Sequence, residues 1–316
     1  MRVASVRVAA LLSGLLLVSC SDGDQKSCVV ETVADLTLLP GLWRPTVEAT
    51  LDGQKVALLI DTGTDTSIVT PEATDRFRLR PADDNRHLRL AGVGGVDDAP
   101  VVVLRHLQLG HGESSNLELP VSSSIHGSAD GVPIIGLFGA DFMANYDVDV
   151  DVPDHHFALR SLHQCGREIA PFDGPYFEVP FRLEATKIRL DIKVNNVPVE
   201  AVLDTGAPHT LIDMADARRI GLTHDALAAD RVYRAKGDAE DQADVTVHRF
   251  DSLEVGAERL NHFRFAVADS YLGDTLLGDD FLAHNRVWIS YPRQMLYIQP
   301  AANDAIIHQD GAPPAK

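Results

Sequence analysis

Two short segments of the chain hold carboxyl groups in a setting that suits acid–base chemistry. The tripeptide Asp-Thr-Gly occurs at 61–63 and again at 204–206, each time after an apolar run. Two carboxyls about 3 Å apart cannot both ionise near neutrality, so such a pair keeps one proton. One carboxylate can then take a proton from water while the other carboxyl donates one, which is enough to hydrolyse an amide without a metal or a covalent intermediate. We therefore interpret Asp61 and Asp204 as a candidate catalytic pair.

The sequence around the two tripeptides is itself repeated. A second motif, Gly-x-Asp-Phe after two apolar residues, begins at Gly139 and again at Gly278. The tripeptides lie 143 residues apart and the second motifs 139 residues apart. Two ordered signatures at a nearly constant offset indicate an internal duplication. We expect a first copy over 41–160, a linker over 161–175 and a second copy over 176–300.

Each tripeptide follows a predicted β-hairpin. The turns are Asp52-Gly53 in the first copy and Asn195-Asn196 in the second. The flanking predicted strands are Thr46–Leu51, Lys55–Ile60, Leu190–Val194 and Val197–Val202. Glycines, prolines and short β-branched runs punctuate the chain, and long amphipathic periods are scarce, so we predict a mostly β protein.

The second copy in particular resembles a known family. Leu203–Ala207, followed by Thr210-Leu-Ile and later by Leu276–Leu282, is similar to the retroviral-type domain of the aspartic peptidases. The resemblance covers both copies and implies a bilobal aspartic peptidase of the pepsin and retroviral-protease kind. Two closed β-barrel-like lobes with short helices, a polypeptide substrate and no cofactor are the corresponding expectations.

The resemblance also assigns supporting roles at the two turns. It implies that the hydroxyls of Thr62 and Thr205 cross the lobe boundary and lock the turns together. Glycine at Gly63 and Gly206 lets each turn bring backbone N–H groups to the carboxylate.

The copies differ immediately after the tripeptide. Thr64 follows the first and Ala207 follows the second. A hydroxyl at Thr64 could bond the outer oxygen of Asp61 and favour its charged form, whereas alanine offers Asp204 nothing. We therefore predict that the shared proton resides preferentially near Asp204.

A cover for the substrate is expected between the motifs of the first copy. The family places a flap hairpin at the segment containing Gly92, Val93, Gly94 and Gly95, and three glycines suit a mobile cover. The alternative is an ordinary glycine-rich turn. The matching stretch of the second copy, 233–241, has one glycine and a charge run, and we expect a solvated loop there rather than a second cover.

The N-terminus is typical of a bacterial lipoprotein signal. Arg2 and Arg7 precede an apolar run that ends at Ser19-Cys20 and is too short to span a bilayer. We expect 1–19 to be removed, Cys20 to be lipidated, and 20–40 to be a tether, which places the protein in the periplasm, on the outer membrane. An ordinary cleaved signal is the alternative. The tail, 301–316, is expected to be disordered.

Two further cysteines, Cys28 and Cys165, remain in a compartment that permits disulfides. A bridge between them would tie the tether to the region between the halves. Two unpaired thiols are the other possibility.

Charge excludes several classes of partner. The chain has 28 basic and 46 acidic side chains, a net charge of −18 that becomes −20 without residues 1–19. Such a surface repels nucleic acid and anionic lipid, so we expect membrane contact only through the lipid anchor. Asp147, Asp149 and Asp151 alternate with valines, as one face of a solvated strand would. No metal site is expected.

Two other functional readings stay open. A catalytically silent peptide-binding module would keep the cleft, although its expected mark, a damaged Asp-Thr-Gly, is missing. Alternatively, each half could pair with a half of another chain. The short linker makes pairing within one chain cheaper, so we expect a monomer.

Overall fold

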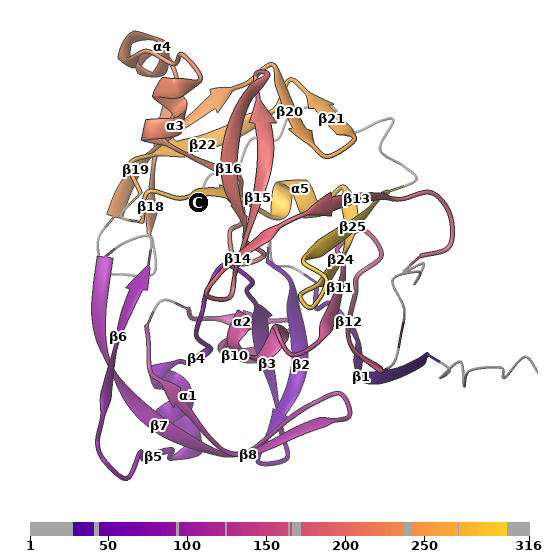
Figure 1. Cartoon of the computed structure of the whole chain (residues 1–316). Helices are drawn as coiled ribbons and strands as arrows, with labels where there is room; N and C mark the ends of the chain where they lie inside the picture. The colour runs from indigo at the N-terminus through magenta and orange to yellow at the C-terminus, as the bar shows by residue number, and fades with distance from the viewer. Residues whose placement is uncertain are drawn as a thin grey trace, which may run out of the picture.

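The computed structural model describes residues 28–40, 44–92, 95–123, 125–163, 165, 172–236, 242–270 and 272–301. Over these residues the prediction of a mostly β chain is confirmed, with five short helices. None of these helices is long and apolar enough to cross a membrane. Figure 1 shows two lobes, the first half of the chain below and the second half above, with a shared sheet between them.

A six-stranded antiparallel sheet joins the two halves of the chain. Its strand order is β1-β12-β11-β24-β25-β13. The first half supplies β1 (Val29–Thr37), β11 (Asp147–Asp151) and β12 (His156–His163), and the second supplies β13 (Phe177–Pro180), β24 (Asn285–Ser290) and β25 (Met295–Pro300). Because β11 pairs with β24 in the middle, neither half completes this sheet alone.

The lower lobe is built on a nine-stranded sheet with the main order β4-β10-β3-β2-β7-β5. Two more strands, β6 and β8, pair with β7, and β9 pairs with β10. The bounds are β2 (Thr46–Leu51), β3 (Gln54–Ile60), β4 (Ile68–Val69), β5 (Arg80–Pro81), β6 (His87–Gly92), β7 (Gly95–Leu109), β8 (Gly112–Pro120), β9 (Ser128–Ala129) and β10 (Val132–Phe138), with helices α1 (Pro71–Phe77) and α2 (Ala140–Met143). The Thr70 side chain caps α1 by accepting a bond from the Ala73 N–H.

The upper lobe repeats this plan in a ten-stranded sheet with the order β18-β19-β22-β17-β23-β16-β15-β20-β21, and β14 pairs with β15. The bounds are β14 (Arg182–Glu184), β15 (Lys187–Val194), β16 (Val197–Leu203), β17 (Leu211–Asp213), β18 (Arg231–Lys236), β19 (Gln242–Arg249), β20 (Ser252–Val255), β21 (Glu258–Asn261), β22 (Arg264–Ala268) and β23 (Thr275–Leu277), with helices α3 (Met214–Arg219), α4 (His224–Ala228) and α5 (Asp279–Leu282). A single cluster of buried apolar side chains extends through both lobes and the joining sheet, so the lobes pack as one unit.

Both predicted hairpins are present, and their turns explain the residues found there. Asp52 and Gly53 have φ values of 51° and 76°, and Asn195 and Asn196 have values of 49° and 63°. Two successive residues with positive φ match the twist of the flanking strands, and Gly, Asn and Asp adopt that conformation most readily.

Two fold predictions need correction. The three sheets are open, so the prediction of closed barrel-like lobes is not confirmed. In the lower lobe, for example, the end strands β4 and β5 are only two residues long. Each pairs with an inner strand, and they do not pair with each other to close the sheet. The tether expected over 20–40 is wrong for residues 29–37, which form β1. This run is rich in valine and threonine, and it pairs along β12 from Val29 opposite His163 to Thr37 opposite His156.

The aspartates of β11 are buried, not solvated as predicted. Asp149 is fully buried and bonds the Arg286 guanidinium through both of its oxygens, at 2.9 and 2.6 Å. Asp147 accepts a bond from the Trp288 indole at 3.2 Å. All five residues of β11 are buried, and its alternating aspartates meet partners from the other half of the chain.

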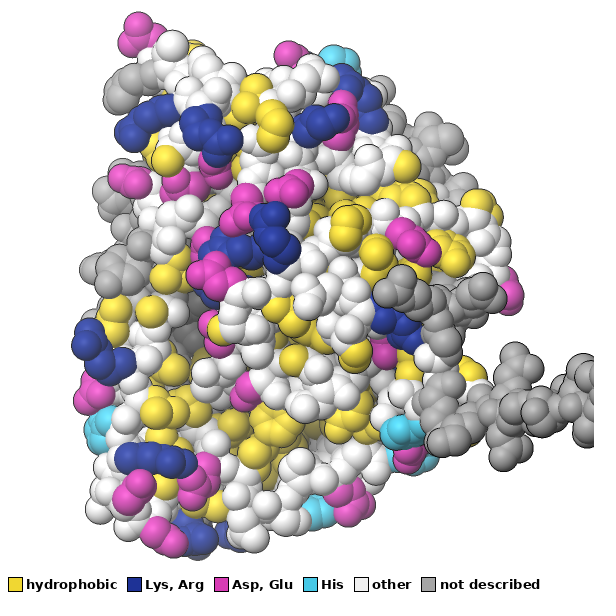
Figure 2. Space-filling model, viewed as in Figure 1, with side chains coloured by type: hydrophobic (Ala, Val, Ile, Leu, Met, Phe, Trp, Pro, Cys, Tyr) yellow, Lys and Arg dark blue, Asp and Glu magenta, His cyan; other side chains and the backbone are white. Residues whose placement is uncertain are grey.

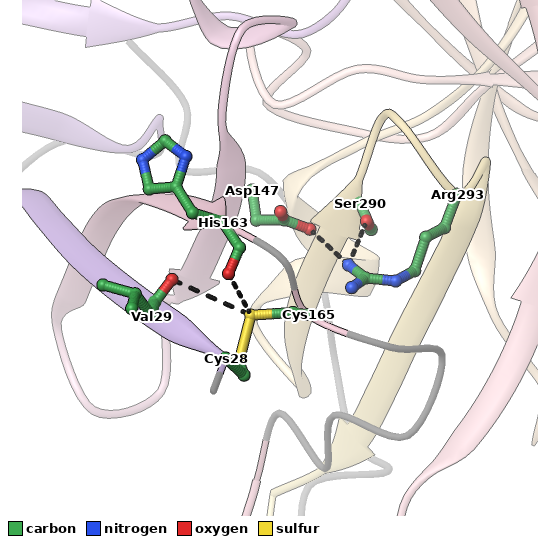
Figure 3. The surroundings of a disulfide bond; sticks show 7 residues. All are labelled: Cys28, Val29, Asp147, His163, Cys165, Ser290 and Arg293. Atoms are coloured by element: carbon green, nitrogen blue, oxygen red, sulfur yellow. Dashed lines mark hydrogen bonds and ion pairs between the residues drawn. A yellow bond between two sulfur atoms is a disulfide. The ribbon is translucent and has the colours of Figure 1, made fainter. Parts of the chain in front are cut away.

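Cys28 and Cys165 are joined by a disulfide. Figure 3 shows the bond beside the start of β1 and the end of β12, with the Asp147–Arg293 ion pair nearby. Cys20 lies outside the described residues, as do the expected signal at 1–19 and almost all of the expected tail.

Candidate active site

The two Asp-Thr-Gly turns begin where inner strands of the two lobes end. β3 lies parallel to β10, and the Asp61 N–H donates to the Phe138 carbonyl at 3.0 Å. β16 lies parallel to β23, and the Asp204 N–H donates to the Leu277 carbonyl at 2.9 Å. Because the ends of β3 and β16 are buried on both faces, each turn starts from a fixed position.

Each aspartate carboxylate accepts two backbone bonds within its own turn. Asp61 Oδ1 accepts from the N–H groups two and three residues further along the chain, at 2.9 and 3.1 Å. Asp204 Oδ1 accepts from the corresponding two groups at 2.8 and 3.1 Å. Bonds of this kind stabilise a charged carboxylate, and they do so equally in the two lobes.

The two turns are connected through their threonines, which are fully buried. The Thr62 hydroxyl donates to the Leu203 carbonyl at 2.7 Å and accepts from the Thr205 N–H at 3.1 Å. The Thr205 hydroxyl donates to the Ile60 carbonyl at 2.7 Å and accepts from the Thr62 N–H at 3.0 Å. Four reciprocal bonds thus cross the lobe boundary in the arrangement that the family resemblance implied.

The glycines allow the carboxyl groups of the two lobes to come together. A Cβ atom placed on Gly63 would lie 2.3 Å from Asp204 Cγ. A Cβ atom placed on Gly206 would lie 2.3 Å from Asp61 Oδ2. Each carboxyl group therefore packs directly against the turn of the opposite lobe, and a side chain at either glycine would collide with it.

The contact predicted for Thr64 is wrong. Its hydroxyl donates to the Thr66 carbonyl at 3.3 Å rather than to Asp61. Its backbone N–H bonds Asp61, and the N–H of Ala207 bonds Asp204 in the same way. Since a backbone donor does not depend on the side chain, this position supplies no difference between the two carboxyls.

A second acidic residue in each lobe braces the segment that leaves the turn. Asp141 accepts bonds from the Ser67 N–H at 3.1 Å and the Ser67 hydroxyl at 2.7 Å. Asp280 accepts bonds from the Thr210 N–H at 2.8 Å and the Thr210 hydroxyl at 2.6 Å. The sequence analysis noted the repeated Gly-x-Asp-Phe motif without assigning this role, although the conserved offset between the copies was the signal.

Asp279, the residue before Asp280, is buried without a compensating bond. Neither carboxyl oxygen has a hydrogen-bond partner in the described structure. Burial raises the pKa of Asp279 well above its usual value, and the negative charges of Asp204, Asp280 and Asp61 add to the rise, while Arg44 opposes it. Sequence reasoning missed this group because the motif leaves its second position unspecified.

Tyr291 is a second buried polar group, and it lies near Asp61. Its hydroxyl has no hydrogen-bond partner among the described residues. Burial raises its pKa, and the nearby carboxylates of Asp61 and Asp65 raise it further. Tyr291 therefore stays a neutral phenol at any ordinary pH and packs edge-on against Phe181.

Each lobe carries a hairpin of similar length on the same side of the molecule (Figure 1). β6 and the start of β7 pair at six positions up to Gly92 opposite Gly95. β18 and β19 also pair at six positions, from Arg231 opposite Val247 to Lys236 opposite Gln242. The solvated loop expected over 233–241 is therefore wrong for the strand residues at its start. Val93, Gly94 and 237–241 lie outside the described residues.

The arrangement offers two carboxyls from opposite lobes, each held by backbone donors. Among the described residues, no group of three or more His, Cys, Asp or Glu side chains is placed to hold a metal ion. Two carboxyls so placed could exchange protons with a substrate as a general acid and a general base.

Comparison with known families assigns each lobe separately. Residues 47–142 match the model of the aspartyl protease family, and residues 190–284 match that of the gag-polyprotein aspartyl proteases. No curated protein matches the sequence. Each matched range contains one Asp-Thr-Gly turn and its Gly-x-Asp-Phe brace, so the chain carries two aspartyl protease domains in tandem, one in each lobe.

Proposed function

We propose that the protein is an aspartic endopeptidase whose single active site forms between the lobes, with Asp61 and Asp204 as the catalytic residues. One observation carries the proposal: each carboxyl packs against the glycine of the opposite turn. The family matches support peptidase chemistry in general. The packing between lobes supports one site within one chain, and hence an active monomer.

The mechanism follows from a shared proton. A water molecule between the carboxyls loses a proton to the ionised aspartate as its oxygen attacks the peptide carbonyl carbon. The protonated aspartate donates its proton to the carbonyl oxygen, which gives a neutral tetrahedral intermediate. The intermediate then collapses as the C–N bond breaks: the protonated aspartate donates its proton to the leaving nitrogen, and the ionised aspartate takes a proton from one hydroxyl of the intermediate, which leaves a carboxylic acid and an amine. Two groups that begin in different protonation states therefore perform every proton transfer.

The substrate is an extended polypeptide segment. Hairpins from both lobes lie on the same side of the molecule (Figure 1), as covers for such a segment would. The net charge of −18 favours neutral or basic polypeptides. Acidic and basic side chains are interspersed on the face shown in Figure 2, so the excess negative charge forms no single patch there.

We propose a periplasmic location, with Cys20 lipidated and the protein held at the outer membrane. The signal-like residues 1–19 support this proposal, as does the disulfide between Cys28 and Cys165, because disulfides persist in oxidising compartments. Metabolic labelling with a radioactive fatty acid tests it. Label should enter the wild-type protein and be lost in Cys20→Ala.

The decisive experiment is cleavage of an unfolded protein by the soluble form that starts after Cys20, measured between pH 3 and 8. Asp61→Asn and Asp204→Asn should each abolish cleavage, because either change removes one of the two proton-transfer groups. Exposed Asp75→Asn is the matched control and should retain full activity. Gel filtration during the assay should show a monomer.

Other outcomes point elsewhere. If no form cleaves at any pH but unfolded peptides still bind, the chain is a silent peptide-binding module. If cleavage survives in either active-site variant, the proposed pair is not the catalytic one.

A further inference from the structure

The upper lobe places an additional carboxyl group next to the catalytic pair. β10 is followed by Gly139 and Ala140, whereas β23 is followed by Gly278 and Asp279. The backbones correspond, because the Ala140 N–H donates to a carbonyl of the first turn at 3.0 Å and the Asp279 N–H donates to the Ala207 carbonyl at 2.9 Å. A methyl group and a carboxyl group therefore occupy equivalent positions in the two lobes.

Asp279 belongs to the segment that holds the Asp204 turn. The Leu277 carbonyl accepts the Asp204 N–H, and two residues later the Asp279 N–H reaches back to Ala207. The Gly278 backbone between them is so close that a Cβ atom there would lie 2.7 Å from the Ala207 carbonyl oxygen. The Asp279 carboxyl thus starts from backbone that is packed directly against the second catalytic turn.

None of the described residues donates a hydrogen bond to the Asp279 carboxyl. It is 4% exposed, and both of its oxygens are buried without a partner. The neighbouring Asp280, by contrast, accepts two bonds from Thr210. The charged groups that act on Asp279 are Asp204 most strongly, then Asp280, Arg44 and, most weakly, Asp61. Arg44 supplies the positive charge in this set.

The rest of the catalytic site is nearly symmetric. The backbone bonds to Asp61 and Asp204 match within 0.1 Å, and the threonine bonds are reciprocal. Thr64 adds nothing to this balance, since its hydroxyl bonds the Thr66 carbonyl. Charge also differs just after the turns, where Asp65 and Thr66 correspond to Pro208 and His209, and Asp65 bonds Thr186. In the segments that hold the turns, Asp279 is the difference that brings charge.

We propose that Asp279 is a positioning residue of the catalytic pair: by ionising near Asp204 as the pH rises, its carboxyl keeps the shared proton on Asp204 and leaves Asp61 as the base. This inference rests on the proposed function. Asp61 and Asp204 then have different roles in proton transfer, although matching backbone bonds hold both carboxyls.

The charge distribution follows from repulsion among three carboxyls. The first negative charge belongs to the catalytic pair, where backbone donors stabilise it. A second charge on the same pair would face a like charge about 3 Å away, which is strongly unfavourable. Placed on Asp279 instead, it lies near Arg44 and acts only weakly on Asp61, so Asp204 retains the proton. The pair then loses its last proton only at a higher pH.

The test is the pH dependence of kcat/KM for wild type and Asp279→Asn. Asparagine has the same shape but cannot ionise, so the second charge must fall on the catalytic pair. We expect the alkaline limb of the profile to move to lower pH by about one unit, the shift typical of one nearby charge. Asp75→Asn, which removes an exposed negative charge, should leave the limb in place.

A double variant tests whether the position of the third carboxyl matters as well as its charge. Ala140→Asp combined with Asp279→Asn moves the carboxyl to the equivalent position of the lower lobe. The alkaline limb should return toward the wild-type pH, with the shared proton now on Asp61. Circular dichroism and thermal unfolding at pH 5 verify that each variant is folded, and Asp279→Glu, which keeps a titratable group, should retain the wild-type limb.

Carbon-13 NMR of aspartate-labelled, substrate-free protein gives a readout independent of activity. In wild type, the Asp204 carboxyl should stay protonated to a higher pH than Asp61, and in Asp279→Asn this difference should shrink. Equal titration of the two carboxyls in wild type, or an alkaline limb that does not move in Asp279→Asn, overturns the inference. If the protein cleaves nothing, the proposed function fails, and the NMR titration alone decides the role of Asp279.

Discussion

The lower lobe has Ala140 bonded to its Asp-Thr-Gly turn, whereas the upper lobe has Asp279 at the same place. Everything that fixes the backbone here is shared, including the parallel strand pair and the bonds from each aspartate N–H to the neighbouring strand. The lobes diverge in side chains that do not hold the backbone. Duplication therefore preserved the scaffold that brings the carboxyls together, and substitution then gave the two carboxyls different electrostatic surroundings.

The bracing residues show the same contrast in a milder form. Ser67 with Asp141 and Thr210 with Asp280 make matching bonds, but Asp141 is exposed while Asp280 is partly buried. Burial raises the pKa of Asp280, although the bonds from Thr210 act in the opposite direction. The upper lobe thus relies on interactions that are better shielded from water.

The largest effect is expected where the lobes are identical. Gly63→Ala and Gly206→Ala would each place a Cβ atom 2.3 Å from a carboxyl atom of the opposite lobe. Displacing a catalytic group by about 1 Å costs about a hundredfold in rate, so both variants should lose at least that much kcat/KM. Gly53→Ala, whose Cβ would meet open space, is the control and should cost stability rather than activity. A large loss of kcat/KM in only one of these two variants would contradict the equivalence of the two turns.

The bracing aspartates should differ in how much stability they provide. Asp280→Ala leaves the Thr210 donors without acceptors in a shielded position and should lower the free energy of unfolding by about 2–3 kcal/mol. Asp141→Ala should cost about 1 kcal/mol, because Asp141 is exposed and water can take the place of its carboxyl beside Ser67. Urea unfolding at pH 6 measures both. Equal losses would show that burial does not separate the two braces.

Asp279 should make stability fall as the pH rises. Its pKa in the folded state is raised, so the stability linked to it is fully present below the pKa of the unfolded chain, about 3.9, and is lost as the pH rises through the folded value. Relative to wild type, Asp279→Asn should gain up to about 1.4 kcal/mol per pH unit across that window. Thermal unfolding from pH 4 to 7 follows the difference, and parallel curves would contradict the raised pKa.

The smallest effect is expected at Thr64. Thr64→Ala makes the two turns alike, and the backbone N–H that bonds Asp61 is retained. The pH profile of kcat/KM should therefore shift by less than about 0.3 unit, well under the effect of a nearby charge. A shift comparable to that of Asp279→Asn would restore the hydroxyl at Thr64 as the source of asymmetry.

Much of the scaffold is predictable from the sequence because repetition makes local signals reliable. The turns at Asp52-Gly53 and Asn195-Asn196 and the apolar strands before Asp61 and Asp204 each occur twice in the same order. A pattern that recurs at a fixed offset indicates a structural unit even where one copy alone would be ambiguous.

The predictions failed where the environment comes from distant parts of the chain. Alternation of Asp and Val in β11 is what a half-exposed strand shows, and only the position of β11 inside the joining sheet puts Arg286 beside Asp149. The same reason applies to β1, whose partner lies more than a hundred residues away. Asp279 could not be recognised either, because its burial depends on the contact between β23 and the Asp204 turn.

The disulfide has a mechanical consequence for the start of the chain. Tension applied ahead of Cys28 would, without the bond, peel β1 from β12 one residue pair at a time, beginning where Val29 lies opposite His163. Cys28 and Cys165 clamp that end of the ladder, so unzipping cannot begin there. The load passes through a covalent link into the middle of the chain, so the hydrogen bonds between β1 and β12 do not have to bear it.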